Sequence, residues 1–334
     1  IPYFGGIAML GGVAVAFVLA SQLPFLGRYL VVSHDSMAIL LGGTVICAVG
    51  VLDDLVELSA IAKIAGQVLA AGIVVLNGVK IFWIPLPDSI IALDDASAIV
   101  VTVVFIFVCV NAINLIDGLD GLAAGVTAIG ALAFLSYAYL LSYELNLVRA
   151  TTASLVTAAT AGACLGFLPH NFSPARIFMG DSGALLLGFL LATSSISLTG
   201  QIDSSGLAAG GNLLPSYLPL ILPIAIMFLP FLDLVLAYVR RTWAGKLWYV
   251  ADRQHLHHRL LERGHSTRRA VIIMYLWSAV MSFGVIAIVL SGGAMWVAVG
   301  GVLAAMAALA VLTVAPGTQL WRGDKPRRLA PPDR

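Results

Sequence analysis

Three groups of acidic and amide side chains stand at the ends of apolar segments, and their residue types suit cation and phosphate chemistry. The first is Asp53-Asp54, the second runs from Asn111 to Asp120, and the third is Asp181. Carboxylate and carboxamide oxygens suit Mg²⁺, which keeps several waters and uses one or two protein groups together with substrate phosphates. No Cys or His lies among these acids, so zinc is not indicated. Carboxylates that converge on a partly dehydrated surface repel each other, so the pattern predicts a cation that offsets them.

The second group is the most informative, because its polar side chains recur every three positions. They are Asn111, Asn114, Asp117 and Asp120. On a helix, successive members of this set step about 60° around the axis and stay on one broad face. Gly118 and Gly121 then allow the backbone to break and to approach a ligand closely. The run therefore predicts a functional role.

Structural alternatives stay open for the other polar residues. Asp181 could cap the helix that follows it, and Asp53 with Asp54 could form a solvated helix end. Lys63, which we place about two turns inside the third apolar segment, could extend back to the membrane interface. It could instead pair with an anion on the same side as the acids, since charges inside a membrane are functional candidates.

A basic loop over residues 240–269 is the fourth feature. After a set of interfacial aromatic residues it carries Arg253, His255, His257, His258 and Arg259. The loop could be an amphipathic helix that lies on lipid. A metal site is another interpretation, although no HExxH pattern and no fourth ligand accompany the histidines. Imidazoles flanked by arginines better suit a diphosphate, to which guanidinium groups offer forked donors.

The elements that must position these residues are transmembrane helices. Of the 334 residues, 60% are hydrophobic and only 10% are charged, whereas a soluble domain has about 25% charged residues. This composition excludes a water-soluble globule, a disordered chain and a disulfide scaffold. About ten stretches are long enough to cross a bilayer. Their centres are Val13, Thr44, Leu69, Val104, Leu132, Val156, Leu190, Ile226, Val280 and Leu303. We expect an all-α, polytopic membrane bundle over residues 1–314.

The basic residues predict how the bundle lies in the membrane. When the loops are numbered alternately, all but three of the 18 Lys and Arg residues fall on one side, the exceptions being Arg28, Lys80 and Arg149. The positive-inside rule places this basic side, both termini and all three acidic groups in the cytoplasm. The tail over residues 315–334 is basic and Pro-rich, and we expect it to be disordered or to lie on anionic headgroups.

Together these residues resemble the polyprenyl-phosphate N-acetylhexosamine-1-phosphate transferases. The resemblance runs from Pro2-x-x-Gly5-Gly6 to about His265, which is most of the chain. It comprises Asp53-Asp54, the Asn111–Gly121 run, Phe178-Met179-Gly180-Asp181 and the HxHH loop, in that family's order and spacing. Such enzymes move a sugar 1-phosphate from a UDP-sugar to a membrane lipid phosphate and release UMP.

The resemblance implies a role for each of these residues. Asp181 resembles the principal Mg²⁺ ligand, with Asn114 as its carbonyl partner, and Mn²⁺ could substitute for Mg²⁺. Phe178 resembles the residue that stacks on uracil. The implied catalytic residues are Asp53, Asp54, Asp117, Asp120, His255, His257 and His258. The implied substrate-binding residues are Lys63, Asn111, Gly118, Leu119, Phe178, Arg253 and Arg259.

Asp53 and Lys63 match positions that meet the lipid phosphate, and the role of Asp53 is open. A phosphate monoester has its second pKa near 6, so at pH 7 it is already mostly dianionic. An ordinary Asp, with a pKa near 3.9, gains little by removing that proton. We therefore expect Asp53 to orient the lipid phosphate, or to act as a base only if its pKa is raised.

The form of the histidine loop indicates the sugar. Asp252-Arg253-x-His255-x-His257-His258-x-Leu260 resembles the branch that uses UDP-N-acetylglucosamine (UDP-GlcNAc). The branch that uses UDP-MurNAc-pentapeptide, our alternative, usually has three consecutive histidines. The implied acceptor is a polyprenyl phosphate (undecaprenyl or decaprenyl) in the bacterial inner membrane, and the reaction would be the first membrane step of cell-envelope polysaccharide synthesis. No nucleic acid partner is expected. Such family members often form homodimers, and the sequence does not decide whether this chain does.

Two other classes of protein fit the sequence less well. An ion-coupled transporter would have inverted repeats and charges near the bilayer midplane, and a noncatalytic scaffold would not explain an Asn/Asp run beside paired glycines. The chain also departs from the family at its start. Members begin with one more span and a basic segment, whereas Tyr3 and Phe4 stand here where a basic residue is common. We therefore expect the natural beginning to be missing or the numbering to start late.

Overall fold

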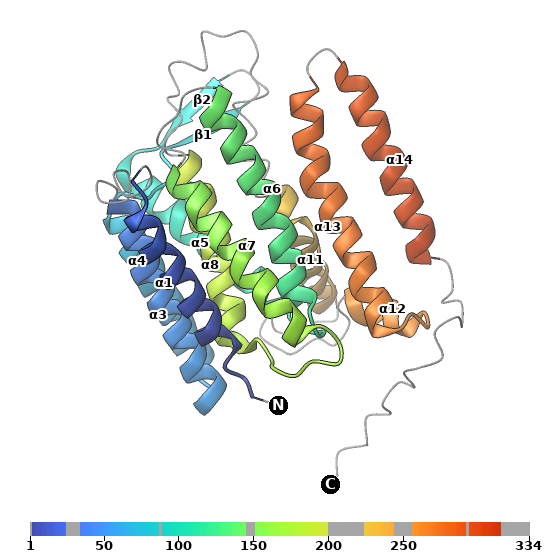
Figure 1. The fold of residues 1–334 in the computed structure, drawn as a ribbon, viewed down its shortest axis with the longest axis horizontal. Helices are drawn as coiled ribbons and strands as arrows, with labels where there is room; N and C mark the ends of the chain where they lie inside the picture. The colour runs from blue at the N-terminus through green and yellow to red at the C-terminus, as the bar shows by residue number, and fades with distance from the viewer. Residues whose placement is uncertain are drawn as a thin grey trace.

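Long apolar helices run side by side through the part of the chain that the computed structural model describes (Figure 1). That part comprises residues 2–24, 34–86, 89–144, 151–199, 224–243, 256–291 and 294–314. The helices are α1 (Gly5–Gln22), α3 (His34–Val56), α4 (Ala60–Leu76), α5 (Asp95–Ile116), α6 (Leu122–Glu144), α7 (Thr151–Asn171), α8 (Gly180–Thr199), α11 (Phe228–Trp243), α12 (Leu256–Glu262), α13 (Thr267–Leu290) and α14 (Met295–Val314).

Eight helices within these ranges are long and apolar enough to cross a membrane: α1, α3, α5, α6, α7, α8, α13 and α14. A ninth, α4, is apolar but has only 17 residues, whereas about 20 residues span the hydrocarbon core without thinning it. Together these nine helices contain nine of the ten predicted span centres. The prediction of an all-α, polytopic membrane bundle is confirmed.

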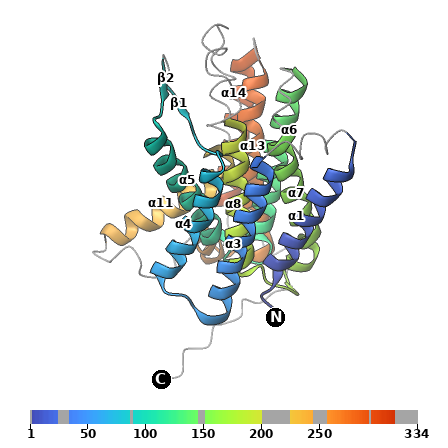
Figure 2. The same cartoon turned by 90° about the vertical axis from the view of Figure 1, so that its left-hand side faces the viewer.

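The tenth predicted centre, Ile226, lies just ahead of α11, and residues 200–223 before it fall outside the described ranges. The 16 residues of α11 are strongly amphipathic and include Arg240 and Arg241. Figure 2 shows α11 running across the direction of the long helices. By its length and composition, α11 is not a membrane span. About ten spans were expected, and the described part of the chain has eight full-length spans and the shorter α4.

Within the described residues, a two-stranded hairpin departs from a purely helical fold. Strand β1 (Trp83–Leu86) pairs antiparallel with β2 (Ser89–Ala92), with Trp83 opposite Ala92. The hairpin lies at the end of the bundle opposite to the first residues of α1 (Figure 1). The tail after residue 314, for which disorder was expected, lies outside the described residues.

Helix α8 forms the centre of the bundle, since all of residues 182–198 are buried. Small residues bring its first turn into backbone contact with two other helices, as is common between membrane helices. A Cβ added to Gly50 of α3 would lie 2.4 Å from Cα of Ser182, and one added to Gly6 of α1 would lie 2.3 Å from N of Gly183. The beginning of α1, the end of α3 and the beginning of α8 therefore meet at one point, which is where the acidic groups lie.

Candidate active site

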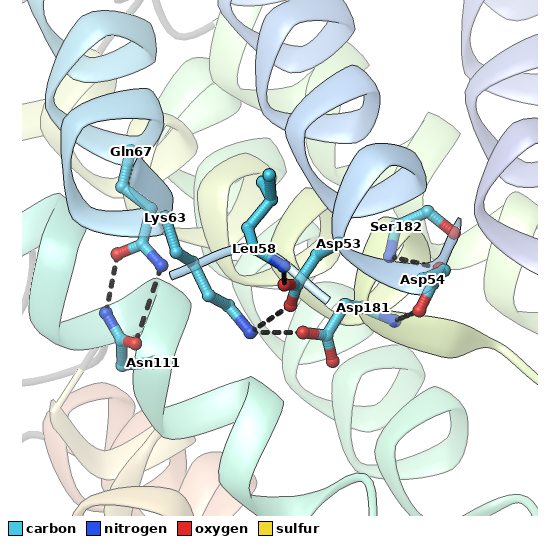
Figure 3. A network of polar contacts seen from close by, with 8 residues as sticks. All are labelled: Asp53, Asp54, Leu58, Lys63, Gln67, Asn111, Asp181 and Ser182. Atoms are coloured by element: carbon cyan, nitrogen blue, oxygen red, sulfur yellow. Dashed lines mark hydrogen bonds and ion pairs between the residues drawn. The ribbon is translucent and has the colours of Figure 1, made fainter. Parts of the chain in front are cut away.

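The Lys63 side chain joins two of the three acidic groups (Figure 3). Its Nζ lies 2.7 Å from Oδ2 of Asp53 and forms a second ion pair with Oδ2 of Asp181. Asp53 lies in the last turn of α3, Lys63 in the first turn of α4 and Asp181 in the first turn of α8. The expected depth of Lys63 was wrong: α4 begins at Ala60, so the lysine lies at the helix end beside the acids and not two turns inside the span.

Asp54 binds the beginning of α8. Its Oδ1 accepts a hydrogen bond from the backbone N–H of Asp181 at 2.8 Å, and its Oδ2 accepts one from that of Ser182 at 3.2 Å. A carboxylate at a helix N-terminus satisfies free N–H groups and interacts favourably with the helix dipole. The cap of α8 is thus supplied by Asp54 from another helix, and the side chain of Asp181 is left to face Lys63.

The Asn/Asp run does not stay helical along its whole length. Helix α5 ends at Ile116, and Asp117 is its C-terminal cap residue. The following turn is tied to the α7–α8 connection, since Asp120 Oδ2 accepts a hydrogen bond from N–H of Ala175 at 3.1 Å. Gly121 has a φ of +80°, which confirms the expected break there. The run therefore contributes two helical amides and a folded turn.

Asn111 and Asn114 have different surroundings, although both lie on α5. Asn111 Nδ2 donates a 2.7 Å hydrogen bond to Oε1 of Gln67 on α4. Asn114 lines a pocket that Asn111 does not reach. The predicted contact of Asn111 with substrate therefore has no counterpart in the geometry of this pocket.

The pocket has a volume of about 660 Å³ and opens among the ends of α3, α4, α5 and α8. Its predicted lining residues are Asp54, Lys63, Asn114, Asp117, Gly118, Leu119, Asp120, Phe178 and Asp181. The pocket is also lined by five residues for which no role was predicted: Tyr3, Leu115, Asn171, Met179 and Gly180. A pocket of this size can enclose a nucleotide sugar.

Contacts with neighbouring segments explain why two of these five residues, Tyr3 and Asn171, line the pocket. Tyr3 lies beside Phe178, with ring centroids 5.3 Å apart, because the N-terminal segment is bonded to the α7–α8 connection through Phe178 N–H and Pro2 C=O at 3.0 Å. Asn171 Oδ1 accepts a hydrogen bond from N–H of Gly121 at 3.0 Å and so holds the turn after α5. The available signal for Tyr3 was its place as an aromatic residue inside the Pro2-x-x-Gly5-Gly6 motif; Asn171, at a helix end, offered none.

The histidine loop is described only in part. Arg253 and His255 lie outside the described residues, and His257, His258 and Arg259 lie on α12, where Arg259 is exposed. The helix that follows is fixed to the pocket region, because Nε of Arg268 donates to the carbonyl of Ser173 at 3.0 Å and the hydroxyl of Tyr275 donates to the carbonyl of Gly121. These contacts keep the beginning of α13 at the pocket end of the bundle.

The electrostatics of the pocket favour a bound cation. Burial raises the pKa of the Asp117 carboxyl to about 7, and the carboxylates of Asp181, Asp54 and Asp120 act in the same direction. Oxygen ligands line the pocket, and in the described residues no three His, Cys, Asp or Glu side chains are close enough to hold a metal ion by themselves. This donor set fits Mg²⁺, which typically completes its shell with water and substrate phosphates.

The fold and the pocket define an integral membrane protein with a polar, acidic site at the ends of its spanning helices. Comparison with known proteins narrows this class. The family model for glycosyl transferase family 4 matches residues 36–199. The chain is 44% identical, over 85% of its length and 71% of the relative's, to a decaprenyl-phosphate N-acetylglucosaminephosphotransferase of Mycobacterium tuberculosis.

Two further relatives show where the chain lies among such enzymes. It is 36% identical to a probable undecaprenyl-phosphate N-acetylglucosaminyl 1-phosphate transferase of Bacillus subtilis, over 88% of this chain and 75% of that protein. It is 32% identical to a phospho-N-acetylmuramoyl-pentapeptide-transferase of Desulforudis audaxviator, over 58% and 62% respectively. The chain therefore belongs to glycosyl transferase family 4, among the polyprenyl-phosphate N-acetylhexosamine-1-phosphate transferases.

Proposed function

We propose that this protein transfers N-acetylglucosamine 1-phosphate from UDP-GlcNAc to a polyprenyl phosphate, giving polyprenyl-diphospho-GlcNAc and UMP. The mycobacterial and Bacillus relatives, which are named as transferases of this type, support this reaction. The observation that carries it is the position of Lys63, which lines a pocket large enough for the donor and whose ammonium group pairs with both Asp53 and Asp181.

The chemistry that the site must perform is the approach of two anions. The ammonium group of Lys63 offsets part of their repulsion, and positioning with electrostatic stabilisation dominates phosphoryl transfer in general. Asp53 orients Lys63 and the lipid phosphate, which at pH 7 needs no base to ionise it. Phe178 and the turn after α5 bind the uridine. Asp181 and Asn114 are the residues that would hold Mg²⁺, and the ion would supply positive charge that offsets the charge of the diphosphate.

The proposed placement in the cell follows from the basic residues. Most Lys and Arg residues fall on the loops that lie on the same side as the pocket. The positive-inside rule therefore puts the site on the cytoplasmic side of a bacterial inner membrane. The UDP-sugar and the headgroup of the lipid phosphate can both reach the site from that side.

The test is transfer by purified protein in detergent with a panel of UDP-sugars and polyprenyl phosphate. UDP-GlcNAc should be used in preference to UDP-MurNAc-pentapeptide, the substrate type of the second branch. Labelled UMP should exchange into UDP-GlcNAc only with lipid phosphate present, and both EDTA and Asp181→Asn should abolish the exchange. A protein that exchanges no UMP under any of these conditions would contradict the proposal, as a transporter or a scaffold would.

A further inference from the structure

A buried pair of carboxamides joins α4 to α5 next to the pocket (Figure 3). Gln67 is 2% exposed, and its Oε1 accepts a 2.7 Å hydrogen bond from Nδ2 of Asn111, while its Nε2 donates to Oδ1 of Asn111 at 3.5 Å. Asn111 Nδ2 also donates to the carbonyl of Phe107 at 2.7 Å. Neither Gln67 nor Asn111 lines the pocket.

This pair lies one helical turn away from residues that do line the pocket. Gln67 follows Lys63 by four residues on α4, and Asn111 precedes Asn114 by three residues on α5. A helix is stiff over one turn, with 3.6 residues per turn. The rotation of α4 that is set at the carboxamide pair is therefore passed directly to Lys63.

Helix α4 needs such a contact because it lies at the edge of the bundle. It packs on α3 and α5, and its outer face is open, with Ile61 81% and Leu69 60% exposed. Apolar packing against lipid or protein discriminates weakly between rotations of such a helix, since lipid tails are as apolar as leucine. A buried carboxamide is costly unless its donor and its acceptor are both satisfied, so the pair allows few rotations of α4.

We infer that Gln67 is a positioning residue for the phosphate acceptor. Its pairing with Asn111 fixes the rotation and depth of α4 and so holds the ammonium group of Lys63 against Asp53 and Asp181. The inference rests on the proposed function, in which Lys63 meets the lipid phosphate. It also gives Asn111 a different task from direct contact with substrate.

The first test is a set of four variants assayed for transfer with the lipid phosphate and UDP-GlcNAc varied separately. Gln67→Leu and Asn111→Leu should each raise KM for the lipid phosphate about threefold to twentyfold, or about 0.7 to 1.8 kcal/mol at 1.4 kcal/mol per factor of ten. KM for UDP-GlcNAc should change less than twofold. Gln67→Leu with Asn111→Leu should be no worse than either single change, because one interaction is lost.

The fourth variant exchanges the two amides, Gln67→Asn with Asn111→Gln, so that the same total side-chain length spans the same gap. It should recover most of the wild-type KM for lipid phosphate. If Asn111 contacted substrate directly, Asn111→Leu would be more harmful than Gln67→Leu and the exchange would not rescue activity, which would overturn the inference.

A matched control separates positioning from general stability. Ser36 of α3 and Thr152 of α7 form another buried interhelical hydrogen bond, at 3.5 Å, at the other end of α3 from Asp53. Ser36→Ala should lower the thermal unfolding midpoint in detergent about as much as Gln67→Leu while leaving both KM values unchanged. Equal KM changes in the two variants would refute the inference. A wild-type protein without transfer activity would instead refute the proposed function.

Discussion

The Asp54 carboxylate caps the helix that carries Asp181, with Oδ1 of Asp54 2.8 Å from the backbone nitrogen of Asp181. The two residues are 127 positions apart in the sequence. Glycine is required directly before Asp181, since Gly180 has a φ of +69° and a Cβ there would lie 2.5 Å from Oδ2 of Asp54.

The cap predicts that the geometry of Asp54 matters more than its charge. Asp54→Ala should lower the free energy of unfolding by about 0.5 to 2 kcal/mol, whereas Asp54→Asn should cost less, because its single amide oxygen can still accept one of the two backbone hydrogen bonds. Transfer activity should follow the same order. Thermal unfolding in detergent and initial rates provide the check. Asn and Ala variants that are equally inactive and equally stable would show instead that the charge of Asp54 acts in the chemistry.

The contact between Lys63 and Asp181 predicts competition between the lysine and a divalent ion. Lys63→Gln removes a positive charge next to Asp181, so the substrate-free variant should bind Mn²⁺ about tenfold more tightly than wild type. The same variant should lose most transfer activity. Electron paramagnetic resonance of free Mn²⁺ measures the affinity directly. Unchanged Mn²⁺ binding would place the ion away from Asp181.

The raised pKa of Asp117 predicts a dependence of stability on pH. In the unfolded chain this carboxyl titrates near 3.9, and in the folded protein near 7, so between these values the folded state binds more protons. Its ionisation therefore destabilises the fold progressively as the pH rises from about 4 to 7. Asp117→Asn should unfold at a higher temperature than wild type at pH 8 in EDTA and at nearly the same temperature at pH 4. Equal differences at both pH values would contradict this origin.

Phe178 is predicted to bind the nucleobase by stacking. Phe178→Leu keeps an apolar side chain but loses the aromatic face, and base–aromatic stacking is worth about 1 to 3 kcal/mol. KM for UDP-GlcNAc should rise about fivefold or more, as each 1.4 kcal/mol is tenfold, with KM for lipid phosphate unchanged. Phe178→Tyr serves as the control and should stay close to wild type. Identical kinetics for Leu and Tyr would exclude stacking.

Gly125 is predicted to be required for the packing of α13 on α6. A Cβ at this position would lie 2.0 Å from Cζ of Tyr275, whose hydroxyl binds the Gly121 carbonyl. Gly125→Ala should destabilise the protein by about 1 to 3 kcal/mol through overpacking.

The matched control for this change is Gly162→Ala on α7. A Cβ there meets no atom within 4 Å, and alanine should be neutral or stabilising by up to about 1 kcal/mol in a helix. Thermal unfolding of the two variants checks the pair. Similar effects of both alanines would contradict close packing at Gly125.

Much of the fold could be predicted because membrane-spanning helices are recognisable as long apolar stretches of sequence. Nine predicted span centres lie in apolar helices, and the expected break occurs, but it begins at Asp117, so Asp117 and Asp120 do not share a helical face with Asn111 and Asn114 as predicted. The exceptions have physical reasons. The hairpin at Trp83 is too short to give a periodic signal, and α11 carries its apolar residues on one face and its arginines near its end. The depth of Lys63 was wrong because the start of α4 is set by Ser59, which caps it, and not by hydropathy.

The sequence by itself determined the chemistry that is available: oxygen-bearing side chains at the ends of apolar segments, one lysine near them, and glycines that permit close approach. The tertiary structure decided which of these groups act on one another. It directs Asp54 to the backbone of α8, Lys63 to both Asp53 and Asp181, and Asn111 to Gln67. These assignments depend on the rotation and depth of helices far apart in the chain, which side-chain packing fixes and local residue patterns do not encode.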